Sequence, residues 1–102
     1  MTYEEANAKR PQIDAGVAEA LAELAPDVVE IQYKIALDST DEWSVFVRAV
    51  LSDEAAKDIR KLASRIFHTI SDKIDLGTIG MFSYVDFRSQ SDQAKSKEPA
   101  WV

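Results

Sequence analysis

The sequence predicts an α+β domain in which a three-stranded sheet carries two helices on one face. Residues 28–37 and 43–51 alternate between apolar and other residues with a period of two, which is typical of strands with one dry face. A stretch with helical spacing precedes them and another follows. With 102 residues, 46% of them apolar, and no cysteine, the chain fits a single globular domain and cannot be a disulfide scaffold.

Residues 11–24 are expected to form the first helix. Pro11 suits the first turn of a helix, and Pro26 would stop it. The apolar residues at helical spacing between them are Ile13, Val17, Leu21 and Leu24. Residues 1–10 are polar, and we expect them to form a loose arm.

Residues 28–37 and 43–51 should pair as an antiparallel hairpin across a turn at residues 38–42. One face of the first strand carries Glu30, Gln32 and Lys34. The matching face of the second strand carries Ser44, Phe46, Arg48 and Val50. The opposite face of both strands is apolar, so we expect it to lie against the helices.

A second helix is expected over residues 53–73, where apolar residues keep helical spacing and Ser52 can cap the first turn. Gly77 and Gly80 then break the chain. Residues 81–88 alternate again and form the third expected strand.

Residues 89–102 are expected to form a polar tail, so that the single domain spans residues 11–88. Trp101 is the exception in this tail. Its large apolar area would be used either by folding back onto the sheet or as a linear docking motif for another protein.

The element order is αββαβ, and the helix between the second and third strands makes a crossover. Placing the third strand beside the first gives the strand order 2-1-3, antiparallel throughout, in a two-layer sandwich. This arrangement resembles half of a ferredoxin-like domain, and it also resembles the cytoplasmic domains of cation-efflux transporters. The resemblance is one of topology and implies no function. The metal ligands of the efflux domains are not found, since the chain has one histidine.

A second resemblance concerns the last third of the chain. The segment from Phe87-Arg88-Ser89 to Pro99-Ala100-Trp101 resembles the ends of small bacterial αββαβ proteins with no known activity. It therefore implies no activity for this chain.

The uncovered face of the sheet is the expected functional surface. Aromatic and arginine side chains on a charged face are typical of partner interfaces. The residues assigned to this interface are Phe46, Arg48, Phe82, Tyr84, Arg88 and Trp101. Because the core is small, we expect either a homodimer or a complex with another protein, and the function to be that of a non-enzymatic interaction or regulatory module.

Two other functions are open. An aromatic sheet face could bind single-stranded nucleic acid, although a net charge of -6 weighs against it. Glu30 and Asp86 could form an acid–base pair of an enzyme if the first and third strands pair.

Other charged groups are better explained as solvated surface. On the second helix, Lys57, Lys61, Arg65 and His68 form a basic stripe. His68 and Asp72 supply too few ligands for a metal, and the acidic turn at residues 38–42 lacks the calcium-loop pattern. No phosphate loop or dinucleotide fingerprint is present, so no cofactor is expected. Without an apparent signal peptide or membrane span, a cytoplasmic location is expected.

Overall fold

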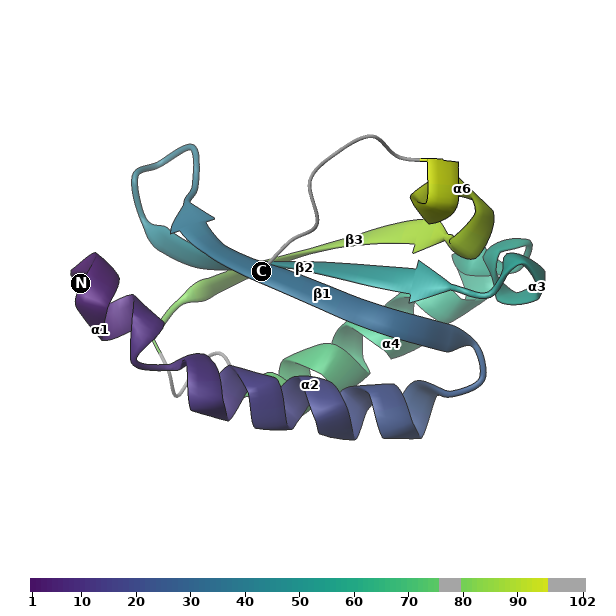
Figure 1. The fold of residues 1–102 in the computed structure, drawn as a ribbon, viewed down its shortest axis with the longest axis horizontal. Helices are drawn as coiled ribbons and strands as arrows, with labels where there is room; N and C mark the ends of the chain where they lie inside the picture. Colours follow the sequence, from purple (N-terminus) through teal and green to yellow (C-terminus); the bar gives the residue numbers. More distant parts are fainter. Residues whose placement is uncertain (76–79, 96–102) are drawn as a thin grey trace.

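The computed structural model describes residues 1–75 and 80–95 (Figure 1). Its elements are α1 (Tyr3–Asn7), α2 (Arg10–Leu24), β1 (Val28–Leu37), β2 (Trp43–Leu51), α3 (Asp53–Ala56), α4 (Ile59–Ile74), β3 (Phe82–Ser89) and α6 (Gln90–Lys95). The predicted first helix, the hairpin and the third strand are confirmed to within one residue at their ends. The chain is α+β, with helices packed on an open three-stranded sheet.

The sheet has the order β1-β2-β3, with β2 in the centre. β1 pairs antiparallel with β2, as the hairpin requires, whereas β3 pairs parallel with β2. The predicted order 2-1-3 with antiparallel pairing throughout is therefore wrong. β3 runs in the predicted direction but lies on the other side of the hairpin, because the crossover through α3 and α4 is long enough to return the chain beside β2.

Burial explains why β2 takes the central place. Every residue of β2 from Ser44 to Leu51 is buried except the half-buried Phe46. A strand covered on both faces has a nearly continuous apolar sequence, which β2 has and β1 lacks. The polar residues of β1 are better hydrated at an edge, and within the described residues this strand pairs with β2 alone.

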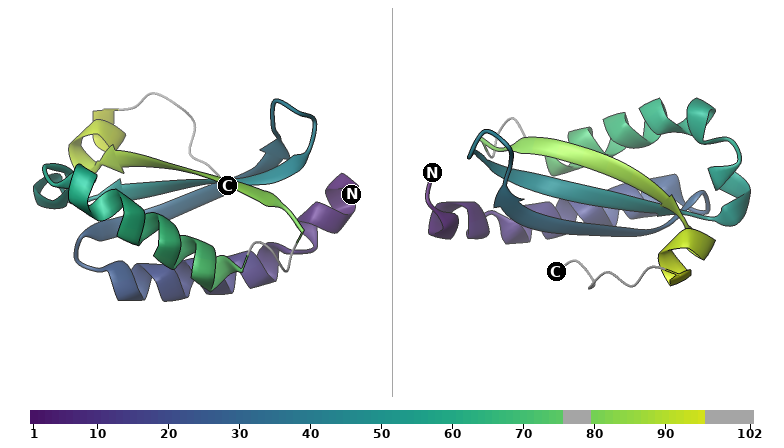
Figure 2. Two further views of the ribbon diagram at one scale, coloured as in Figure 1. Left: turned by 180° about the vertical axis from the view of Figure 1, so that it is seen from behind. Right: turned by 90° about the horizontal axis from the view of Figure 1, so that it is seen from above.

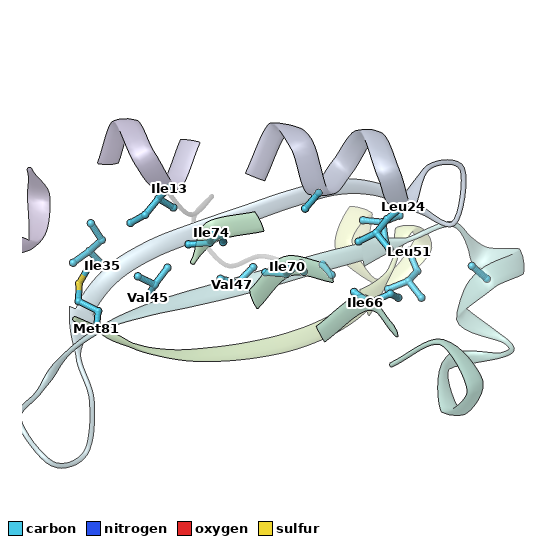
Figure 3. Close-up of a cluster of buried hydrophobic side chains, with 14 of the residues drawn as sticks. Ile13, Leu24, Ile35, Val45, Val47, Leu51, Ile66, Ile70, Ile74 and Met81 are labelled. Atoms are coloured by element: carbon cyan, nitrogen blue, oxygen red, sulfur yellow. The ribbon is translucent and has the colours of Figure 1, made fainter. Parts of the chain in front are cut away.

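α2 and α4 cover one face of the sheet and form the second layer (Figure 2). The core lies between the layers (Figure 3). It is built from Ile13 and Leu24 of α2, Val45, Val47 and Leu51 of β2, and Ile66, Ile70 and Ile74 of α4. The two helices approach closely at Gly16, where an added Cβ would lie 2.5 Å from the Lys73 carbonyl oxygen.

The ends of the domain carry helices where loose segments were expected. Within residues 1–10, α1 is closed by a capping box in which Thr2 and Glu5 bond each other's backbone N–H groups, and the Tyr3 ring lies 5.3 Å from that of Trp43. Within residues 89–102, α6 follows directly on β3. The helix expected over residues 53–73 is divided at Lys57 and Asp58 into α3 and α4. The cap predicted at Ser52 is confirmed, because its hydroxyl accepts a bond from the Ala55 N–H.

Candidate functional site

The open face of the sheet is the face away from α2 and α4. Because successive side chains alternate between faces, the strand register arranges the open-face residues in rows that run from β1 across β2 to β3. The four rows are Ala36, Ser44 and Phe82; Lys34, Phe46 and Tyr84; Gln32, Arg48 and Asp86; and Glu30, Val50 and Arg88.

Three aromatic residues gather in the first two rows, and we call Phe46, Phe82 and Tyr84 the aromatic patch. The Phe46 and Tyr84 rings are stacked, with centroids 5.2 Å apart and an angle of 19° between their planes. The Lys34 Nζ lies 5.7 Å from the Phe46 centroid, which is within cation–π range. Phe82 is 61% exposed and Tyr84 44% exposed, so the patch presents apolar surface to solvent.

Asp38 follows β1 at the start of the hairpin turn and is hydrogen-bonded to Tyr84 of the patch. The Tyr84 hydroxyl donates to its Oδ2 at 2.9 Å, and the Ser44 hydroxyl donates to the same oxygen at 3.0 Å. Its Oδ1 accepts from the N–H and hydroxyl of Thr40 and from the N–H of Glu42. These bonds, that from the Thr40 hydroxyl foremost, hold the pKa of the Asp38 carboxyl well below its ordinary value. The same carboxylate raises the pKa of Tyr84.

Arg48 and Asp86 form an ion pair beside the patch. The Arg48 Nε and Nη2 each donate to one Asp86 oxygen at 3.2 Å. The Arg48 side chain is 6% exposed and that of Asp86 52% exposed. The pair therefore presents its carboxylate to solvent and keeps the guanidinium beneath the surface.

The six residues assigned to the interface from the sequence fall into different environments. Phe46, Phe82 and Tyr84 are brought together as expected. Arg48 is buried, and Arg88 lies two rows from the patch, at the end of β3 that leads into α6. Trp101 lies outside the described residues.

The acid–base pair proposed for Glu30 and Asp86 depended on pairing between the first and third strands. That pairing does not occur, because β2 separates β1 from β3. Asp86 is instead bound by Arg48, and Glu30 accepts a bond from Gln32 at 2.9 Å. The open face thus brings no two carboxylates into one row.

The charged groups on the helices are dispersed as a solvated surface. Lys57 lies 3.9 Å from Glu54, and Arg65 lies 3.8 Å from Asp27. The exposed His68 lies edge-on to the ring of Phe67. In residues 1–75 and 80–95, no three histidine, cysteine or acidic side chains are grouped so that they could hold a metal ion.

A groove that the sequence did not indicate opens at the carboxyl ends of β2 and β3. It has a volume of about 540 Å³ and is lined by Leu51, Ala56, Ile59, Phe87, Arg88, Ser89 and Asp92. Ligands often bind at the carboxyl ends of parallel strands. Because the sequence predicted no parallel pair, it gave no reason to expect a groove at this place. Neither Glu30 nor Asp86 lines the groove.

The open face is bounded at both ends. The hairpin turn and α6 lie on the open side of the sheet at opposite ends of the strands (Figure 1). α6 contacts β2 and β3, and Asp53 of α3 accepts bonds from the N–H and hydroxyl of Ser91. The aromatic patch lies nearer the hairpin turn, so α6 covers the opposite end of the face.

Comparisons with protein-family models, with curated proteins and with solved structures give no match to this chain. Among the helices of the described ranges, none combines the length and the apolar character needed to cross a bilayer.

Proposed function

We propose that the chain is a non-enzymatic protein-interaction module whose open sheet face binds an extended basic segment of another protein. The aromatic patch is the observation that carries this proposal. An exposed apolar group rimmed by polar side chains is typical of an interaction site. Aromatic residues also supply much of the binding energy at such sites.

The shape of the face supports an extended segment as the occupant. The hairpin turn and α6 both stand on the open side of the sheet. A broad flat partner would meet these two ends before it reached the patch. A single extended segment can lie between them and direct alternate side chains at Phe82 and Tyr84.

Lys34 lies on the β1 side of the patch, but the charges on its other sides support a basic partner. Asp86 exposes its carboxylate on one side of Tyr84, and Asp38 binds the Tyr84 hydroxyl on the other. The turn adds the exposed Asp41 and Glu42. Together with the net charge of -6, these groups attract lysine and arginine side chains, and the attraction weakens with added salt.

Single-stranded nucleic acid fits this face less well. Bases bind such sheets by stacking on the faces of aromatic rings. Here the Phe46 and Tyr84 rings stack on each other, so the ring faces that point toward each other are not accessible to a base. The acidic side chains around the patch, namely Asp38, Asp41, Glu42 and Asp86, would also repel phosphates.

The test uses a synthetic peptide in which lysine alternates with valine and phenylalanine, titrated into the isotope-labelled chain and followed by amide chemical shifts. We expect shifts in β2 and β3 and a dissociation constant that rises with salt. Phe82→Ser should weaken binding by about 10- to 30-fold, because it removes the most exposed ring of the aromatic patch.

Phe67→Ser is the matched control, since Phe67 is an exposed phenylalanine on α4, in the opposite layer. It should leave the affinity for the peptide unchanged. Three results would contradict the proposal. They are shifts that map to α4, equal binding of a peptide with glutamate in place of lysine, or no binding at millimolar peptide.

A further inference from the structure

The outer edge of β1 is a second surface that the fold leaves open. β1 has one strand neighbour, β2, and among residues 1–75 and 80–95 no backbone hydrogen bond crosses its other side. Its sequence from Val28 to Leu37 contains neither proline nor glycine. Viewed from above, α2 lies beneath the sheet, whereas α4 extends outward from β3 (Figure 2). The edge of β1 is thus the more accessible one.

An edge of this length without proline or glycine can be a template for another strand, although it carries Glu30, Lys34 and a β-bulge at its start. We infer that two copies of the chain pair their β1 strands antiparallel, with Gln32 at the two-fold axis, and form one continuous six-stranded sheet. This inference goes beyond the proposed function, because it uses the backbone edge of β1 and not the aromatic patch.

The pairing register follows from the two faces of β1. Residues that lie directly opposite each other in an antiparallel pair have their side chains on the same face of the sheet. The pairing must therefore match the open face of one copy with the open face of the other, because only then do Ile31, Tyr33 and Ile35 stay over the helices. A register centred on Lys34 would place two lysines in contact, and one centred on Glu30 would place two glutamates in contact. Such like-charge pairs are unfavourable.

Centring the pair on Gln32 avoids both conflicts and, unlike the face-matched registers centred on Ile31 or Tyr33, places opposite charges directly across from each other. It places Glu30 of each copy opposite Lys34 of the other, so the interface gains two opposite-charge pairs on the open face. On the covered face it places Ile31 opposite Tyr33. The β-bulge between Val28 and Glu30 lies outside the central paired residues, where it does not interrupt them.

The first test is the mass in solution, measured by light scattering over a range of concentrations. We expect the wild-type chain to dimerise, and Glu30→Lys and Lys34→Glu to be monomeric when each is alone. Mixing these two variants should restore a dimer, because each opposite-charge pair is re-formed between unlike chains. Phe82→Ser should leave the dimer intact, which separates this inference from the proposed function.

The second test uses the absence of cysteine from the chain. Residues at the centre of an antiparallel pair have Cβ atoms about 5 Å apart, close enough to form a disulfide after small adjustment. Gln32→Cys should therefore cross-link rapidly under mild oxidation. Ala36→Cys is the control on the same strand and face, since its partner's equivalent would lie roughly 26 Å away.

Two results would overturn the inference. One is a wild-type chain that stays monomeric at millimolar concentration. The other is cross-linking of Ala36→Cys as fast as that of Gln32→Cys, which would exclude this register.

Discussion

Asp38 links the hairpin turn to β3 through a single carboxylate. Hydrogen bonds from Thr40, Glu42, Ser44 and Tyr84 stabilise its charged form and hold its pKa below the ordinary value. In the unfolded chain these bonds are absent, and the pKa returns to about 3.9. The folded state therefore binds the proton less readily than the unfolded state does. Its contribution to stability is complete above the unfolded pKa and is lost as the pH falls toward the folded one.

Asp38→Asn should consequently reduce the difference between the unfolding free energies at pH 7 and pH 3, measured with urea at both pH values. Asp41→Asn is the control, because Asp41 lies in the same turn but is exposed, and asparagine tolerates its φ of 60°. An Asp38→Asn chain with the wild-type pH dependence would show that the carboxylate does not act in this way.

Single-residue predictions from the sequence succeeded where strand periodicity alone decides the outcome. The periodicity placed Phe46, Phe82 and Tyr84 on one face without knowledge of the neighbours. It did not reveal that Asp38 bonds Tyr84, because a turn side chain finds its partner only when a distant strand is placed beside it. The sequence predicts Arg48 at the interface. Arg48 is buried instead, because β3 pairs with β2 and places Asp86 beside the Arg48 guanidinium.

At the scale of elements, the contact between α2 and α4 depends on Gly16. A Cβ there would lie 2.5 Å from the Lys73 carbonyl oxygen and 2.7 Å from the Ile74 Cα, both of which are backbone atoms. Gly16→Ala gains about 1 kcal/mol of helix propensity but must push the helices apart, which costs about 1–3 kcal/mol. We expect a net loss of about 1 kcal/mol, measured by urea unfolding.

Ala18→Gly on the exposed side of α2 gives the effect of propensity alone, about 1 kcal/mol of destabilisation. A Gly16→Ala chain that is more stable than wild type would show that the helices separate without loss of packing.

Short elements were the least predictable part of the fold. α1 does carry a sequence signal, since Thr2 and Glu5 have the spacing of a capping box. α6 carries a related signal, because Ser89 lies three residues before Asp92 and its hydroxyl accepts a bond from the Asp92 N–H at 3.1 Å, as an N-cap does. This helix buries none of its residues and is instead attached through Ser91 to Asp53, a contact between residues 38 positions apart. Local sequence indicates a cap at Ser89 but not the distant contact that attaches this helix.

For the whole molecule, the sequence predicted the strands and their directions but not their order. The direction of β3 followed from the number of times that the chain crosses the molecule before β3 begins. The strand that lies beside β3 depended instead on which hairpin strand is buried on both faces. That information was present in the composition. Val45, Val47 and Val50 mark β2 as the apolar strand, and Glu30 and Lys34 mark β1 as an edge.

The separation of β3 from the hairpin along the chain has a consequence for local unfolding. The hairpin closes through a short turn, whereas Arg48–Asp86 and Asp38–Tyr84 join residues 38 and 46 positions apart. Such distant contacts carry a larger loop-closure cost. We expect amide hydrogen exchange by NMR to show that β3 opens at a lower free energy than the β1–β2 ladder. The surface offered to a partner would then come apart and re-form while the hairpin stays closed, and equal protection of all three strands would contradict this.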